Sequence, residues 1–113
     1  MAYSETLAAR VRQIIPPTVR VEEKKMMGGL TFMVNGKMCV GVAGNALMFR
    51  IDPADYETAL AHPACRKMDF TGRPMSGFVF VDEAGLDTDQ ELIDWVGLAL
   101  AFNDKAIPSR KHR

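Results

Sequence analysis

Three pairs of turn-forming residues divide the stretch from Glu22 to Ile51, and they constrain its fold more than any other feature. Each pair separates two short apolar runs, and the three are Gly28-Gly29, Asn35-Gly36 and Gly44-Asn45. Two-residue hairpin loops require positive φ angles, which Gly and Asn adopt at little steric cost. The pattern therefore predicts a four-stranded antiparallel meander, with strands near residues 21–27, 30–34, 37–43 and 46–51.

Helix signals lie on both sides of this meander. Ser4 is placed to cap a helix that begins at the next residue and ends before Pro16-Pro17. Asp52, followed by a proline, favours a second, short helix. Thr88 and Glu91 have the spacing of a capping box for a third helix. The buried side of this third helix is expected to carry Leu92, Trp95 or Val96, Ala99 and Phe102.

Two further strand-like runs, residues 66–70 and 77–81, lie between the second and third predicted helices. The predicted order is helix, three or four strands, helix, two strands, helix. We predict an α+β fold of two layers, in which one antiparallel sheet (the meander plus a further hairpin) carries its helices on one face. A single domain should span residues 1–105, and the basic tail, residues 106–113, is expected to be disordered.

Composition limits the classes of function. The chain has 14 basic and 14 acidic side chains, so no overall field attracts nucleic acid or an anionic membrane. Its two cysteines, Cys39 and Cys65, are far apart and form no CxxC motif, which favours a reduced protein. No run has the character of a transmembrane segment or of a signal peptide. We therefore expect a cytoplasmic protein without a membrane partner.

Two-residue turns also fix which strand residues are neighbours. Counting back from each turn places four residues in one row across the meander: Lys25, Phe32, Cys39 and Arg50. Around this row we expect Leu30, Val34, Lys37, Gly41, Ala43, Ala46 and Met48. The opposite, helix-covered face is expected to hold Met26, Thr31, Met33, Met38, Val40, Val42, Leu47, Phe49 and Ile51.

The face that contains this row is a candidate interaction surface. Exposed apolar surface rimmed with charge is typical of a contact site. The candidate residues are Lys25, Phe32, Lys37, Cys39, Met48 and Arg50. The alternative is that residues 66–81 or a loop cover the face. If the face is open, we expect a protein partner, and a homodimer is one form of it.

No group of residues has the pattern of a catalytic or metal site. A nucleophile needs a base within hydrogen-bond reach, and the two histidines, His62 and His112, have no partner fixed by the sequence. No His, Cys or carboxylate cluster has ligand spacing, and the glycine turns lack the context of a phosphate-binding loop. We predict no catalytic, cofactor-binding or metal-binding residue and no cofactor. An enzyme ranks last among the hypotheses.

Two other binding functions stay open. Arg50 beside Cys39 could bind a small anion or a nucleotide. Nucleic acid could bind a local basic patch, but lysines on edge strands commonly serve to block aggregation instead. The residues of such a patch would be Lys24, Lys25, Lys37, Arg50, Arg66, Lys67, Arg73 and the tail.

Two stretches together resemble a known family. KKMMGGLTFMVNGKMCVGVAGNALMFRI, followed by MDFTGRPMSGFVFVD, is similar to the N-terminal domain of the TfoX/Sxy regulators of natural competence. The resemblance runs roughly from Leu7 to Phe102 and implies a two-layer α+β fold like that of type III secretion chaperones and YjbR-like proteins.

The resemblance also implies a function. Full-length members carry a second, helical domain and act with the cyclic-AMP receptor protein at competence promoters. No such domain follows Phe102 here, so we expect a stand-alone N-terminal domain. The family provides no catalytic residues to carry over. The resemblance thus implies a non-enzymatic regulatory or adaptor module, related to transcription, that acts by protein–protein contact.

Overall fold

The computed structural model describes residues 3–26, 29–70 and 73–105 of the chain. Within these ranges the helices are α1 (Glu5–Ile14), α2 (Tyr56–Leu60) and α3 (Asp89–Asn103), and the short 3₁₀ segments are η1 (Pro53–Asp55) and η2 (Glu83–Gly85). The strands are β1 (Val21–Met26), β2 (Gly29–Val34), β3 (Lys37–Ala43), β4 (Ala46–Arg50), β5 (Cys65–Phe70) and β6 (Arg73–Val81). The predicted tail, residues 106–113, lies outside the described residues.

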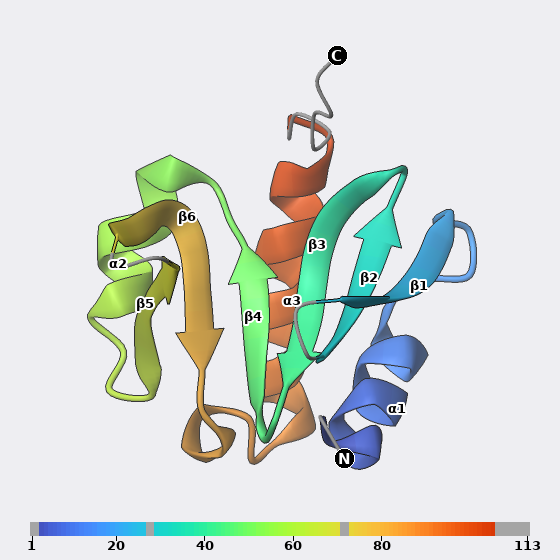
Figure 1. Cartoon of the computed structure of the whole chain (residues 1–113), viewed down its shortest axis with the longest axis horizontal. Coiled ribbons are helices and arrows are strands. Elements are labelled where there is room, and N and C mark those ends of the chain that lie inside the picture. Colours follow the sequence, from blue (N-terminus) through green and yellow to red (C-terminus); the bar gives the residue numbers. More distant parts are fainter. Residues whose placement is uncertain (1–2, 27–28, 71–72, 106–113) are drawn as a thin grey trace.

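These six strands form one antiparallel sheet with the order β1-β2-β3-β4-β6-β5. The first four strands are the predicted meander, and β5 and β6 are a hairpin that joins it through β6. In Figure 1, α3 lies behind β3 and β4, and α1 and α2 lie toward opposite ends of the sheet. The predicted α+β class, with its meander and additional hairpin, is confirmed.

The predicted capping signals and the Asn35-Gly36 turn act as expected, whereas Gly29, predicted as a turn residue, is the first residue of β2 and pairs with Met26. The Ser4 hydroxyl accepts a hydrogen bond from the Leu7 amide at 3.2 Å, at the start of α1. Thr88 and Glu91 form both hydrogen bonds of a capping box at the start of α3. Asn35 and Gly36 have φ angles of 53° and 79°, which a tight hairpin of this type requires.

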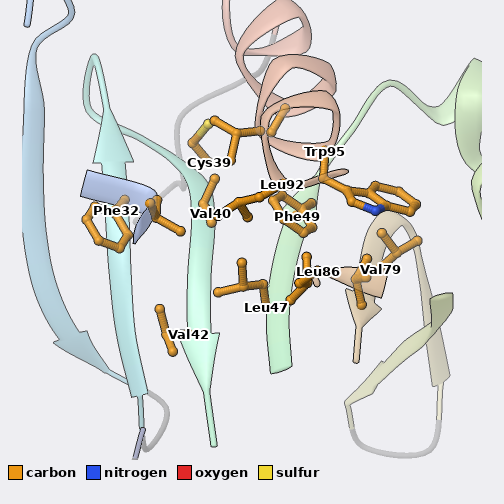
Figure 2. Packing of buried hydrophobic residues seen from close by; sticks show 14 of the residues in the cluster. Phe32, Cys39, Val40, Val42, Leu47, Phe49, Val79, Leu86, Leu92 and Trp95 are labelled. Atoms are coloured by element: carbon orange, nitrogen blue, oxygen red, sulfur yellow. The ribbon is translucent and has the colours of Figure 1, made fainter. Parts of the chain in front are cut away.

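The core lies between the sheet and the helices. Trp95 of α3 stacks on Phe49 of β4, with 5.8 Å between the ring centroids (Figure 2). The two rings belong to one cluster of buried hydrophobic residues. The cluster also includes Leu7 and Val11 of α1, Leu92 and Val96 of α3, and Val79 of β6. The predicted core residues Val40, Val42, Leu47, Phe49 and Ile51 also belong to it, and their placement is confirmed.

The predicted register between β2 and β3 is correct only next to the turn. Val34 pairs with Lys37 and Met33 with Met38, as expected. The register then shifts, and Phe32 pairs with Val40 instead of Cys39. This irregularity places one extra residue of β3 in the pairing, as in a β-bulge. Because side chains alternate along a strand, the shift places Phe32 and Val40 on the same face.

The predicted faces of β2 are therefore exchanged. Phe32 is fully buried in the helix-covered core, and Cys39 lies there too (Figure 2). Leu30 and Val34 accompany them, although the prediction placed all four on the outer face. Two residues predicted for the core, Thr31 and Met33, are buried but lie outside that cluster, on the opposite face. Met38, which pairs with Met33, is half-buried there, and the Met26 side chain lies outside the described part.

The register between β1 and β2 also differs from the prediction, by two residues. Met26 pairs with Gly29, so Lys25 lies opposite Leu30 and not opposite Phe32. Glu23 takes the place opposite Phe32. A shift of two residues preserves the face of each side chain. Lys25 is nevertheless exposed, because β1 is an edge strand.

The face of the sheet opposite the core is closed at its centre. Thr31, Met33, Ala46 and Met48 are each less than 10% exposed, at 2%, 8%, 8% and 3%. The Met48 methyl carbon lies 3.1 Å from the position that a Cβ would take at Gly41. The methionine side chain thus lies over the space that a glycine leaves on the neighbouring strand. The centre of this face is therefore not exposed, as the candidate interaction surface would require.

The exchange of faces can be tested with two variants from the predicted row. Phe32→Ala should lower the free energy of unfolding by about 3–5 kcal/mol, because it empties a fully buried site. Lys25→Ala should change it by less than about 0.5 kcal/mol, because this side chain is exposed. Urea denaturation followed by circular dichroism measures both values. Equally small effects would contradict the observed register.

Candidate interaction surface

The six residues predicted as an interaction surface do not form one surface. Phe32 and Cys39 are core residues, and Met48 is buried on the other face of the sheet. Lys25 is exposed on the edge strand β1. Lys37, the first residue of β3, and Arg50, the last residue of β4, lie toward the same end of the sheet. Both are half-buried.

Lys37 holds the end of α3 against the sheet. Its ammonium group donates a hydrogen bond of 2.8 Å to the backbone carbonyl of Asn103. The Asn103 amide group in turn donates to the Val34 carbonyl at 3.1 Å. A lysine at a helix C-terminus satisfies a free carbonyl and interacts favourably with the helix dipole. Sequence reasoning missed this buried Asn103, because nothing in its neighbourhood marks a polar residue as internal.

Arg50 is held between aromatic rings. Its guanidinium carbon lies 5.4 Å from the ring centroid of Phe78 on β6 and 5.9 Å from that of Phe102 on α3. Both distances are within the range of cation–π contacts. Burial lowers the pKa of Arg50 from its ordinary value. The arginine therefore connects β4 and β6 to α3. The Cys39 thiol, which was predicted to lie beside Arg50 in an anion-binding site, is buried.

The thiols and His62 have surroundings that suit structural roles. Burial raises the pKa of the Cys39 thiol to about 12 and that of the Cys65 thiol to about 11. A nucleophilic cysteine needs a lowered pKa, so neither thiol is activated. The His62 Nδ1 atom accepts a hydrogen bond from the Ala64 amide at 3.1 Å, and its ring lies edge-on to Trp95. Within the described residues no three potential ligands gather as a metal site would require.

Two described hollows lie along α1, and each contains an arginine that is already bonded. In a groove of about 260 Å³ beside Pro16, the Arg12 guanidinium donates two hydrogen bonds to Glu23, at 2.6 and 2.8 Å. This ion pair raises the pKa of Arg12 and lowers that of Glu23. In a second hollow of about 410 Å³, Arg10 donates to the Leu86 carbonyl at 2.9 Å. Each arginine thus already has a hydrogen-bond partner within the chain.

The basic residues considered for nucleic acid are separated across the sheet. Lys24 and Lys25 lie on β1, whereas Arg66 and Lys67 lie on β5, and these two strands are the opposite edges. The Arg66 guanidinium also pairs with Asp82 at 2.8 Å. The side chain of Arg73 lies outside the described part. The described basic side chains of the two edges therefore form no continuous patch.

An exposed apolar surface lies instead on α3. Among the described residues, the large hydrophobic side chains that stand exposed are Ile93 and Leu98, at 44% and 37%. Gly97 and Ala101, also exposed, are one turn apart, and the helical rotation places them between the two large side chains. A Cβ at Gly97 would meet nothing within 4 Å. We call these four residues the α3 outer face.

The sequence does contain a signal for this face, but the prediction of a single buried side of the third helix did not use it. The segment LIDWVGLALAF has apolar residues on all sides of the helix, and such a helix is normally enclosed by other elements. Here the sheet covers only one side of it. Of the helices in the described ranges, none has the length and apolar character needed to cross a membrane.

Comparison with known proteins gives one family match. The model of the TfoX N-terminal domain family matches residues 13–103 of the 113-residue chain. The matched segment contains the whole sheet and α3. No curated protein and no solved structure gives a significant match.

The raised thiol pKa values predict a loss of stability at high pH. The thiol pKa is 9.0 without burial, so between about pH 9 and about pH 11 the folded chain binds more protons than the unfolded chain. The free energy of unfolding should therefore fall as pH rises through this window. We expect a steeper fall for the unmodified chain than for the double variant Cys39→Ala, Cys65→Ala, by urea denaturation at each pH. Parallel curves would contradict the assignment.

Proposed function

Because the chain belongs to the TfoX N-terminal domain family, we propose that it is a regulatory or adaptor module that acts by protein–protein contact. The family suggests a module like those of competence regulators, and a role in the control of transcription follows from that likeness. The observation that carries the proposal is the α3 outer face, with Ile93 and Leu98 exposed. The proposed contact site therefore lies on α3 and not on the face of the sheet that the sequence predicted.

The chemistry of this face suits a protein partner. A surface helix normally turns polar side chains to solvent, and here the outward turn in the middle of α3 exposes Ile93 and Leu98 beside a single charged side chain, Asp94. Removing apolar surface from water contributes about 25 cal/mol per Å², so covering Ile93 and Leu98 favours association. Gly97 and Ala101 are small and would let the backbone of a partner approach between the two larger side chains.

The helix also offers a rigid support for a contact. On its inner side, Leu92, Val96 and Ala99 are each at most 1% exposed. Its first turn is closed by the capping box, and its last turn is tied to β2 and β3 through Asn103. A surface on a well-packed element needs little ordering when it binds, and this lowers the entropic cost of association.

A cytoplasmic location is part of the proposal. Cys39 and Cys65 are both free and buried, and their thiols form no disulfide. Unpaired cysteines are typical of reducing compartments, where transcriptional regulators also act.

Photo-crosslinking in cells of the source organism tests the proposal. A photo-reactive amino acid in place of Leu98 should give a covalent adduct with a protein, because this side chain lies within the contact. The same group in place of Glu57, which is exposed on α2, should give no such adduct. Western blotting of the tagged chain and mass spectrometry of the bands measure both.

A polar substitution provides the matched control. With the photo-reactive group at position 93, Leu98→Asn should reduce the adduct severalfold, since it retains a similar shape and removes the apolar contact. The thermal unfolding midpoint of the variant shows whether its fold is intact. Equal labelling at positions 98 and 57, or no adduct at either, would refute protein contact through α3.

A further inference from the structure

We infer that the edge strand β1 pairs antiparallel with β1 of a second copy of this chain, so that the two sheets join into one. This inference goes beyond the proposed function, because it concerns the edge of the sheet and not α3. Two antiparallel copies of one edge strand are related by a two-fold axis perpendicular to the sheet. The helices of both copies then lie on the same face of the joined sheet.

The backbone of β1 presents hydrogen-bonding groups along its outer side. The Asn35 amide donates to the Arg20 carbonyl at 2.9 Å, which identifies these two residues as a hydrogen-bonded pair just before β1. Hydrogen-bonded and non-hydrogen-bonded pairs alternate along an antiparallel ladder. The groups that point away from β2 therefore belong to Val21, Glu23 and Lys25. No described strand lies beyond β1 in the sheet (Figure 1).

Of the two edges of the sheet, β1 is the regular one. Its six residues, all within the described part, include no proline, and its pairing with β2 continues without a bulge. At the other edge, the register of β5 shifts between Lys67 and Asp69. Bulges and prolines are the features that commonly protect an edge from pairing with a further strand. The backbone of β1 is thus the better template for an additional strand.

The charges of β1 are complementary to those of a second β1 strand. The strand has the sequence VEEKKM, with two glutamates followed by two lysines. A two-fold axis at Glu23 places Glu22 of each copy opposite Lys24 of the other. Both side chains are exposed, and opposite charges at directly opposite positions stabilise a strand pair. Lysines alone on an edge would repel a second strand, but here Lys24 faces a glutamate.

The residue at the axis already has a partner for its charge. Residues that lie opposite each other share a face of the sheet, so one residue of β1 must lie opposite itself. Glu23 suits this position, because Arg12 of the same chain donates two hydrogen bonds to its carboxylate, at 2.6 and 2.8 Å. The two carboxylates at the axis are thus each paired with an arginine. An axis at Lys24 would instead bring two ammonium groups together.

The size of the contact indicates its strength. In this arrangement each outward-pointing residue can exchange two backbone hydrogen bonds with the residue opposite. A standard stable interface buries about 800 Å² per partner, and one short edge strand offers less than that. The dimer should therefore be weak and form at high micromolar concentration.

Sedimentation velocity of the full chain from about 10 µM to about 1 mM tests the inference. We expect a reversible monomer–dimer equilibrium. Glu22→Lys and Lys24→Glu should each weaken their own dimer about tenfold, because each variant sets like charges opposite each other twice. An equimolar mixture of the two variants should dimerise more strongly than either alone, since both pairs are then opposite in charge. Glu57→Lys, on the exposed side of α2, makes the same charge change elsewhere and should leave the equilibrium unchanged.

A disulfide tests the position of the axis. Glu23→Cys should form a covalent dimer on oxidation, because the Cα atoms of a hydrogen-bonded antiparallel pair lie about 5.5 Å apart, within reach of a disulfide. Lys25→Cys should not, since the two cysteines would be displaced by four residues along the strands, about 14 Å. The natural Cys39 and Cys65 are buried and do not compete. Non-reducing gel electrophoresis measures both variants.

The outcomes are decisive for the edge contact and separate it from the proposed function. A chain that stays monomeric up to about 1 mM, a dimer that both charge variants leave intact, or a mixture without gain would overturn pairing through β1. Equal disulfide formation at positions 23 and 25 would overturn the axis at Glu23. Circular dichroism shows whether each variant is folded. None of these results affects contact through α3, which photo-crosslinking at position 98 measures separately.

Discussion

The packing of α3 on the middle of the sheet is the interaction on which the rest of the structure depends. Trp95 stacks on Phe49, and Leu92 and Val96 are fully buried beside it. The capping box fixes one end of the helix, and the hydrogen bonds of Asn103 fix the other. Since the helix cannot rotate without breaking these contacts, its outer side chains are fixed as well. The same packing that closes the core therefore determines which residues of α3 face solvent.

Local signals predicted much of this fold because their effects are local. The turn at Asn35-Gly36 needs only two backbone conformations, and Thr88 with Glu91 needs only one helical turn. Neither depends on distant parts of the chain. The order of the elements followed from such signals, and the antiparallel sheet followed from the short connections between them. At this level the sequence was sufficient.

The faces of the strands could not be predicted in the same way. A turn determines the register only as far as the first irregularity, and the shift between Phe32 and Met33 occurs within two residues of the turn. One displaced residue exchanges the two faces of β2. Apolar residues occupy both sides of this strand, and all of them are buried, so hydrophobicity gave no warning. A strand that alternated polar and apolar residues would have revealed the error.

The α3 outer face is best understood from what folding alone does not require. A glycine in the middle of a helix costs about 1 kcal/mol relative to alanine, and the open space beside Gly97 would accept a larger residue. Exposed Ile93 and Leu98 likewise add nothing to the core of a single chain. Stability and solubility would both favour other residues at these positions. These residues are the physical basis on which we propose contact with another protein through α3.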